Sequence, residues 1–348
     1  MEKMHILIVD DVEFNATLLQ GILNEEYKPR IAINGQEALT QAQSLPLPDL
    51  ILLDVMLPDM DGYEICRKLK ANPLTARVPV IFVSAMSSAN DERVGFEAGA
   101  VDYIHKPISA VVTLARIRTH IALAQQKKFC EEKVELKTHE LEKSQNAAIH
   151  MLAEAGHYND TDTGLHIWRM AAYSRAIASA ADWPVERAEM LELVAPLHDT
   201  GKIGTPDSVL KAPRKLTDEE WVIMKQHSEV GHSILAKSDT PLFLMAAEIA
   251  LYHHEKWDGS GYPHGLSGNE IPESARIVAI SDVFDALTTK RPYKEPWSTE
   301  QAFELIRNES GKHFDPRFVE LFFSVKEQVL EIMAEFNQPD FSLKTKKK

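Results

Sequence analysis

The stretch Leu50-Ile51-Leu52-Leu53-Asp54-Val55-Met56-Leu57-Pro58-Asp59-Met60-Asp61-Gly62 joins an apolar run to a group of acids. Segments with helical periodicity separate this run from four other short apolar runs, which are His5–Val9, Arg30–Ile33, Val80–Val83 and Tyr103–Ile104. Strands that alternate with helices in this way predict a doubly wound, five-stranded parallel sheet covered on both faces. Ligands of such sheets bind at the carboxyl ends of the strands, so the acid that follows Leu53 marks a predicted site.

The length of 348 residues favours more than one domain. The net charge of −14 argues against DNA binding, because a protein neutralises nucleic-acid phosphates with basic patches. The two cysteines, Cys66 and Cys130, follow no metal-binding or redox spacing, which favours a reducing, cytoplasmic compartment. Since no run of about 18 apolar residues is present, we expect no membrane span.

The pattern divides the chain into an α/β domain (1–122), a helical linker (123–150), an all-α domain (151–335) and a flexible tail (336–348). One long helix is predicted from about residue 107 to residue 150, because no Gly or Pro follows Pro107 in that range. An imperfect heptad seam runs along it, formed by Leu123, Cys130, Val134, Leu141 and Ala148. The seam is compatible with a solvated linker and with a coiled coil that forms a homodimer and transmits a signal.

Charged and hydroxyl side chains follow successive predicted strands of the first domain. Asp10 and Asp11 follow the first strand and Asp54 the third, so three carboxylates converge at one edge of the sheet. They repel one another unless a hard cation such as Mg²⁺ lies among them. Ser84 ends the fourth strand and Lys106 follows the fifth, where both can bind a phosphoryl group carried by Asp54.

In this arrangement the first 120 residues resemble the receiver domains of two-component response regulators. The resemblance implies that Asp54 is the phosphoacceptor and that a sensor histidine kinase is a partner. It also implies Mg²⁺ binding by Asp10, Asp11 and Asp54, and a switch formed by Ser84, Tyr103 and Lys106.

The second half of the chain is rich in histidines and carboxylates at suggestive spacings. The candidate metal ligands are Asp162, His166, His198, Asp199, His227, His253, His254 and Asp282. Four of them form two adjacent pairs, His198-Asp199 and His253-His254, and adjacent side chains on a helix diverge by about 100 degrees. Both members of a pair can therefore bind metal only if they serve two ions or if one of them bridges. So many ligands exceed one tetrahedral site and fit a hydrolytic site with two ions.

The motifs around these residues resemble the HD-GYP subfamily of HD phosphohydrolases throughout residues 151–335. They include His198-Asp199, Gly201-Lys202-Ile203-Gly204, His253-His254-Glu255, Gly261-Tyr262-Pro263, Phe284-Asp285-Ala286-Leu287-Thr288 and Phe314-Asp315-Pro316. The resemblance implies a metal-dependent phosphodiesterase that hydrolyses cyclic di-GMP to linear pGpG, and in some members onward to GMP. In this chain, phosphorylation of Asp54 would control that reaction.

The same resemblance assigns roles by position. His166, His198, Asp199, His227, His253, His254 and Asp282 are implied as metal ligands, with Asp199 as the bridge. The implied catalytic residues are His198, Asp199 and Lys202, and the implied substrate contacts are Tyr262, Asp285, Arg291 and Lys294. Some family members have Glu at the position of Asp162, where it reaches a third metal. Because Asp is one methylene shorter, we expect two ions, with Asp162 outside the ligand set or at its edge.

The sequence leaves several alternatives open. Mixed imidazole and carboxylate ligation accommodates Fe, Mn, Ni, Co or Zn, and the resemblance favours Fe or Mn. The second domain could bind cyclic di-GMP or a GGDEF-domain cyclase without turnover, although the complete ligand set counts against this. It could also act on another nucleotide, such as a deoxynucleotide or an alarmone, although the GYP loop counts against that. Nothing in the sequence indicates whether phosphorylation activates or inhibits.

Overall fold

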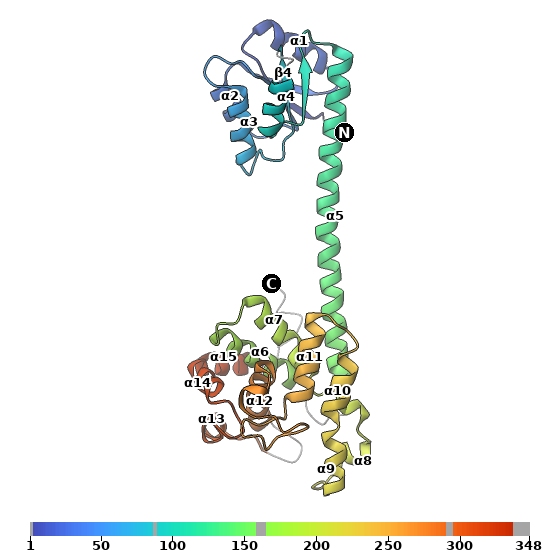
Figure 1. Cartoon of the computed structure of the whole chain (residues 1–348), viewed down its shortest axis with the longest axis vertical. Helices are drawn as coiled ribbons and strands as arrows, with labels where there is room; N and C mark the ends of the chain where they lie inside the picture. The colour runs from blue at the N-terminus through green and yellow to red at the C-terminus, as the bar shows by residue number, and fades with distance from the viewer. Residues whose placement is uncertain (1–2, 86–88, 158–164, 290–294, 337–348) are drawn as a thin grey trace. The chain divides into compact units, whose positions relative to one another are not determined.

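The computed structural model describes residues 3–85, 89–157, 165–289 and 295–336 (Figure 1). The chain divides into two compact units, Met1–His139 and Glu140–Lys348. Among the described residues, no helix is both long enough and apolar enough to cross a membrane.

The first unit contains a parallel sheet of five strands in the order β2-β1-β3-β4-β5. The strands are β1 (His5–Val9), β2 (Lys28–Ala32), β3 (Leu50–Asp54), β4 (Val80–Ser84) and β5 (Asp102–His105). This sheet confirms the predicted doubly wound α/β fold. Asp54 and Ser84 are the last residues of neighbouring strands, so both side chains lie at the carboxyl edge of the sheet.

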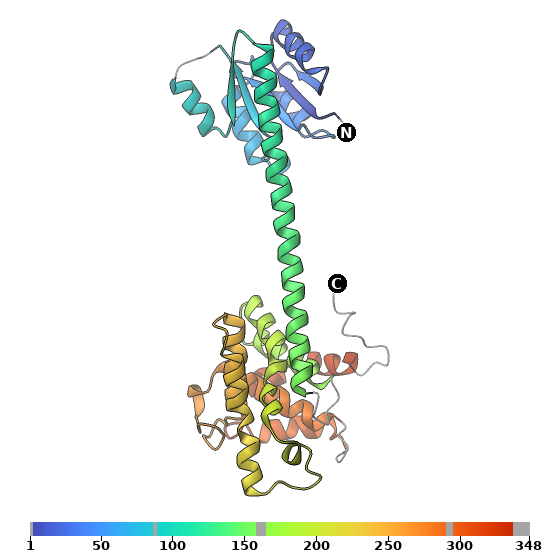
Figure 2. The ribbon, with the colours of Figure 1, turned by 90° about the vertical axis from the view of Figure 1, so that its right-hand side faces the viewer.

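Helices cover both faces of this sheet. They are α1 (Glu13–Leu23), α2 (Gly35–Ala42), α3 (Gly62–Ala71), α4 (Ala89–Glu97) and the beginning of α5 (Ala110–His157). Alternate residues of each strand enter two separate cores, because successive side chains of a strand point to opposite faces. Burial on both faces explains the nearly continuous aliphatic runs of the sequence. Figure 2 shows the first turns of α5 crossing one face, where Ile117 and Ile121 are buried.

Helix α5 has 48 residues, begins at Ala110 and ends at His157. It therefore continues seven residues beyond the predicted end at residue 150. Its last turns are stabilised by burial, because Ile149 and Ala153 belong to the core of the second unit. The side chains of Leu123, Val134 and Leu141 are exposed in the single chain, so the coiled coil stays a prediction.

The regular secondary structure of the described part of the second unit is helical, apart from one isolated bridge between Ser310 and Phe314. Its α-helices are α6 (His166–Ala180), α7 (Val185–Val194), α8 (Asp207–Leu210), α9 (Asp218–Lys225), α10 (His227–Leu235), α11 (Pro241–Tyr252), α12 (Glu273–Thr288), α13 (Thr299–Asn308), α14 (Pro316–Ser324) and α15 (Lys326–Phe336). Short 3-10 helices are η1 (Ala195–Leu197), η2 (Thr200–Gly204) and η3 (Gly268–Glu270). The predicted all-α domain is thereby confirmed.

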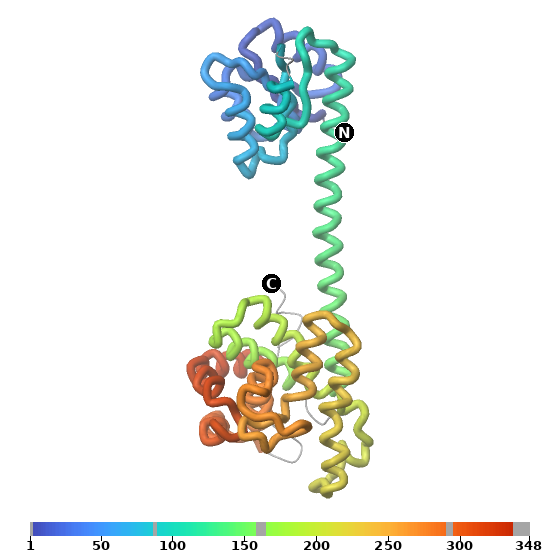
Figure 3. Tube along the Cα trace, viewed as in Figure 1, coloured from blue at the N-terminus to red at the C-terminus, as the bar shows by residue number. Residues whose placement is uncertain are grey.

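Helix α6 is buried along most of its length and packs against α7 and α12. Helices α10 and α11 lie side by side, and α10 also packs against η2 (Figure 3). These contacts bring together chain segments whose ends carry the predicted ligands.

Candidate phosphoacceptor site and metal centre

The first unit gathers the three predicted Mg²⁺ ligands. One carboxylate oxygen from each of Asp10, Asp11 and Asp54 lies within 4.8 Å of the others. Lys106 Nζ lies 2.6 Å from Asp54 Oδ2 and 2.9 Å from Asp10 Oδ2. Burial raises the pKa of Asp54, although the ammonium of Lys106 opposes this effect. Such a set of oxygen ligands beside one fixed cation suits a hard divalent ion and a phosphoryl group.

Tyr103 is buried beside this site, and its hydroxyl donates a hydrogen bond to the backbone oxygen of Asp91 in α4 (3.0 Å). Gly95 makes this position possible, because a Cβ atom there would lie 1.5 Å from the hydroxyl oxygen of Tyr103. The ring of Tyr103 also contacts Phe96 edge to face, with centroids 5.4 Å apart. Through this hydrogen bond and this ring contact, Tyr103 connects β5 with α4.

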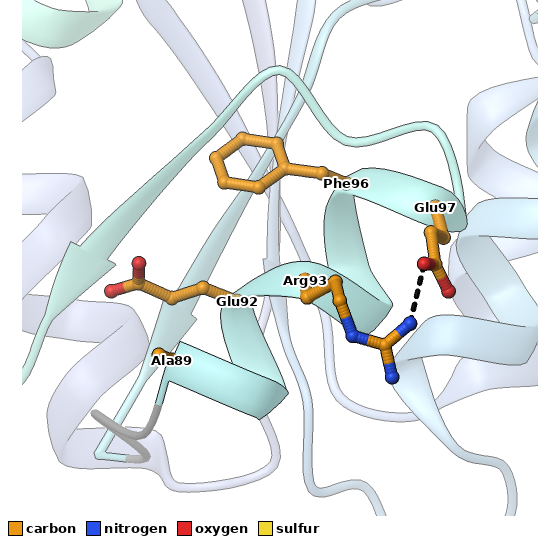
Figure 4. A pocket seen from close by; sticks show the side chains of 5 residues that line it. All are labelled: Ala89, Glu92, Arg93, Phe96 and Glu97. Carbon is orange, nitrogen blue, oxygen red and sulfur yellow. Dashed lines mark hydrogen bonds and ion pairs between the residues drawn. The ribbon is translucent and has the colours of Figure 1, made fainter.

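A depression on the surface of α4 is separate from the carboxylates. Figure 4 shows its lining, which is Ala89, Glu92, Arg93, Phe96 and Glu97. Arg93 and Glu97 form an ion pair across one helical turn (2.5 Å). None of the residues predicted to form a site lines this depression.

In the second unit, five segments deliver the predicted ligands. His198 and Asp199 join η1 to η2. The other ligands are His166 at the start of α6, His227 at the start of α10, His253 and His254 directly after α11, and Asp282 in α12. Most of these side chains are buried, and His198 is only 1% exposed. Asp162 lies outside the described residues.

Asp199 lies between two groups of ligands. Its Oδ1 atom is 3.3 Å from His227 Nε2 and 3.7 Å from His253 Nε2. Ligand atoms of His227, His253, His254 and Asp199 all lie within 4.8 Å of one another. These four residues form the first group.

The second group lies on the other side of Asp199. Asp199 Oδ2 is 3.2 Å from His198 Nε2. Asp282 Oδ1 is 3.6 Å from His166 Nε2 and 3.9 Å from His198 Nε2. Oδ1 of Asp199 therefore faces His227 and His253, whereas Oδ2 faces His198.

Hydrogen bonds orient the histidines of both groups. Nδ1 of His198 donates a hydrogen bond to the backbone oxygen of Ala195 (2.9 Å). Nδ1 of His227 donates a hydrogen bond to the backbone oxygen of Met224 (2.7 Å). A carbonyl can only accept, so Nδ1 carries a proton in each ring and Nε2 is the nitrogen that faces the cluster. Furthermore, His198 Nε2 and Asp199 Oδ1 are buried without a hydrogen-bond partner. The residues present therefore fit a metal site of imidazole and carboxylate ligands.

Comparison with known proteins identifies a family for each part of the chain. The family described as response regulator receiver domain matches residues 6–118, and the family described as HD domain matches residues 130–318. A probable cyclic di-GMP phosphodiesterase of Vibrio cholerae is 39% identical over 97% of this chain and 81% of its own length. The chain belongs to the response regulators with an HD domain.

Two other relatives of this response regulator are informative. The cyclic di-GMP phosphodiesterase response regulator RpfG of Xanthomonas campestris is 35% identical over 96% of this chain and 91% of its own length. A 3'3'-cGAMP-specific phosphodiesterase 2 of Vibrio cholerae is 44% identical over 56% of this chain and 37% of its own length.

Burial and neighbouring charges shift several pKa values in the response regulator's cluster. Burial opposes ionisation of Asp199, but the charges of Lys202 and His198 outweigh it and hold the pKa of Asp199 well below its usual range. Burial also opposes protonation of His198, yet the carboxylates of Asp199 and Asp282 raise the pKa of His198 to about 9. Burial lowers the pKa of His253 and His254, which keeps them in the neutral form that binds metal.

Asp285 corrects one expectation from the sequence. It was expected to contact the substrate, but its side chain is fully buried beneath the cluster. Its Oδ2 atom accepts hydrogen bonds from His166 Nδ1 (2.5 Å), Arg169 Nη2 (2.7 Å) and Thr289 Oγ1 (3.0 Å), and Oδ1 accepts from Arg169 Nε. Asp285 therefore orients a ligand and has no oxygen left for substrate.

Lys202 and Tyr262 lie beside the ligand cluster. Lys202 Nζ is 2.8 Å from Asp199 Oδ2. The ring of Tyr262 stacks on His254 with centroids 4.7 Å apart, and Lys225 Nζ lies 5.2 Å from the centre of the tyrosine ring. Nothing in the sequence singled out Lys225. The other expected substrate contacts, Arg291 and Lys294, lie outside the described residues.

Glu255 fixes the loop that carries Tyr262. This buried carboxylate accepts hydrogen bonds from the backbone nitrogens of His264 (2.7 Å), Gly265 (3.1 Å) and Leu266 (3.0 Å). The loop passes so close to the backbone of Lys256 that Gly261 is required, because a Cβ atom there would lie 2.4 Å from Lys256 N. The sequence motif contained Glu255 without indicating this role.

One residue of the cluster was missed by sequence reasoning. His157 is buried, and one of its ring nitrogens lies within 4.8 Å of ligand atoms of His198 and Asp199. Burial lowers the pKa of His157 to about 4. The available signal was its spacing from Ile149 and Ala153, which places all three on one helix face.

Proposed function

We propose that this response regulator hydrolyses cyclic di-GMP to linear pGpG at a two-metal centre, under the control of phosphorylation at Asp54. The observation that carries the proposal is the position of Asp199, whose two oxygens face two separate groups of ligands. A bridging carboxylate between two ions is typical of hydrolases that cleave phosphate esters. The names of the full-length relatives supply the substrate.

The residues around Asp199 have different roles in the proposed reaction. When bound, two ions supply positive charge for the phosphoryl transition state and make water more acidic. His166, His198, Asp199 and Asp282 would hold one ion, and Asp199, His227, His253 and His254 the other. The ammonium of Lys202, held by Asp199, would lie beside the phosphodiester and offset its negative charge. The ring of Tyr262 would form a wall against which the dinucleotide packs.

We further propose Fe or Mn as the ions of this centre and Mg²⁺ as the ion of the receiver. The donors of the output centre are imidazole nitrogens and carboxylate oxygens, which suits first-row transition metals. Two ions account for all of the described ligands named above, and we expect no third ion. We therefore expect pGpG rather than GMP as the main product.

The receiver site supports the proposed control by phosphorylation. A sensor histidine kinase would phosphorylate Asp54, and the phosphoryl group would draw Lys106 and Ser84 into new contacts. Tyr103 would move with them and displace α4. A homodimer formed through the exposed apolar residues of α5, which include Leu123, Val134 and Leu141, would carry the change along the helix.

The decisive experiment is turnover by full-length protein purified without oxygen and supplied with Fe²⁺ or Mn²⁺. Cyclic di-GMP and 3'3'-cGAMP are offered separately, and the products are resolved by chromatography. The double variant His198→Ala/Asp199→Ala removes a ligand from each group. The matched control is His232→Ala, since the ring of His232 is hydrogen-bonded to the oxygen of Ala247 outside the cluster.

We expect pGpG from the wild type and from the control variant, and none from the double variant. Faster cleavage of 3'3'-cGAMP would replace the proposed substrate. Binding of cyclic di-GMP without turnover, in both unphosphorylated and phosphorylated protein, would instead indicate a non-catalytic module that acts on partners such as GGDEF-domain proteins.

A further inference from the structure

His157 is the last residue of α5 and a buried neighbour of the metal centre. It lies on the same face of the helix as Ile149 and Ala153, at intervals of four residues. Those two residues belong to the hydrophobic core, whereas His157 brings a polar ring to the end of the same face. A buried imidazole needs a partner for each nitrogen, because an unpaired polar atom away from water is costly.

The end of α5 lies unusually close to the segment that carries the central ligands. A Cβ atom at Gly156 would lie 3.1 Å from the Cα atom of Thr200, the residue that follows Asp199. The absence of a side chain at Gly156 therefore allows the helix to approach this backbone. Because of that approach, the adjacent His157 reaches the cluster.

The ring of His157 is held in the same manner as the predicted ligands. Its Nε2 atom donates a hydrogen bond to the backbone oxygen of Pro196 (3.3 Å), two residues before His198. The carbonyl can only accept, so Nε2 carries the proton and Nδ1 keeps a lone pair. The rings of His157 and His198 have centroids 5.6 Å apart, and a nitrogen of His157 lies within 4.8 Å of ligand atoms of His198 and Asp199.

The hydrogen bond to Pro196 uses one ring nitrogen of His157, and the ring also lies close enough to His198 and Asp199 to share an ion with them. A histidine that binds metal usually donates its other ring nitrogen to a backbone carbonyl, which is the arrangement of His157, His198 and His227. We propose that His157 is an additional ligand of the metal centre, so that the end of α5 forms part of the site. The inference rests on the two-metal centre of the proposed function.

The test measures metal binding by the full-length chain in the absence of any nucleotide. Protein stripped with a chelator is titrated with Mn²⁺ by calorimetry and with Co²⁺ by visible absorption, which reports the ligand set. His157→Gln is the informative variant, because its amide can still donate to Pro196 while the ligand nitrogen is lost. His157→Ala removes both functions. The matched control is His150→Gln on the same helix, where the ring stacks on Trp168 (centroids 4.0 Å apart) and not on the cluster.

We expect His157→Gln and His157→Ala to weaken the binding of one ion by about tenfold or more and to change the Co²⁺ spectrum. The control should bind both ions as the wild type does. Thermal melts of the metal-free proteins show whether each variant is folded, and His157→Gln is expected to melt near the wild type.

Two results would overturn the inference. If His157→Gln binds both ions with wild-type affinity and spectrum, His157 serves only as a structural support through Pro196. If both variants bind as the wild type does, the residue has no role in the centre. Failure of the wild type itself to bind two ions would be a failure of the metal centre, and absence of turnover with normal binding would leave the role of His157 intact.

Discussion

His166 Nδ1 lies 2.5 Å from Asp285 Oδ2, in a fully buried contact between the start of α6 and α12. The same carboxylate holds the guanidinium of Arg169. One buried acid therefore both orients a predicted metal ligand and neutralises a buried cation. Such a residue serves the site without touching substrate.

We expect Asp285→Asn to lower the free energy of unfolding by about 3–5 kcal/mol, because it leaves the charge of Arg169 buried and uncompensated. Affinity for the ion held by His166 should fall by about 10- to 100-fold. Urea denaturation and metal analysis measure the two effects. The exposed Asp239 supplies the control Asp239→Asn, and equal behaviour of the two variants would refute the role given to Asp285.

Gly201 tests how closely η2 must pack against α10. A Cβ atom at this residue would lie 1.8 Å from His227 O and 2.4 Å from Gly231 N, and neither backbone atom can rotate away. Gly201→Ala should therefore destabilise the second unit by about 3 kcal/mol or more and displace His227. The melting temperature and the number of bound ions report these changes. Gly204→Ala is the control, because its Cβ atom would meet only a side chain, Val230, at 3.2 Å. A wild-type melting temperature for Gly201→Ala would contradict the close packing of η2 against α10.

Glu255 tests the loop that carries Tyr262. In Glu255→Gln one carboxylate oxygen becomes an amide group, which cannot accept from the backbone nitrogens of the loop. The loop should loosen, and KM for the dinucleotide should rise about tenfold, which corresponds to about 1.4 kcal/mol of binding. Steady-state kinetics separate this rise from a fall in kcat. Glu304→Gln, on the exposed face of α13, should change neither constant, and an unchanged KM for Glu255→Gln would rule out the anchoring role.

Asp54 tests the receiver site. With acetyl phosphate and Mg²⁺, the wild type should gain one phosphoryl group and Asp54→Asn none, as measured by intact-protein mass spectrometry. Asp59→Asn is the matched control from the same acidic stretch, because Asp59 accepts hydrogen bonds from Gly35 N and Gln36 N and faces no phosphate site. Phosphorylation of Asp54→Asn at an equal level would place the acceptor elsewhere.

The same proteins test control of the output. The phosphodonor should change the turnover or the oligomeric state of the wild type and of Asp59→Asn, whereas Asp54→Asn should not respond. Identical responses in all three proteins would disprove coupling between the receiver and the metal centre.

The sequence by itself determined the two fold classes and most of the candidate site. Aliphatic runs that end in Asp54 and Ser84 predict buried parallel strands whose polar ends meet, and this depends only on local pattern and connectivity. The His-Asp and His-His pairs likewise predict two ions, because neighbouring side chains on a helix diverge. Such inferences need no knowledge of which distant segments pack together.

Only the tertiary structure decided what each buried polar residue touches. Asp285 and His166 are 119 residues apart, and their contact turned an expected substrate contact into a support for a ligand. His157 carries no motif, and it reaches His198 and Asp199 because α5 continues past its predicted end and packs closely at Gly156. The physical reason is that burial and hydrogen-bond partners depend on the packing of segments far apart in the chain, whereas periodicity and motif spacing are local.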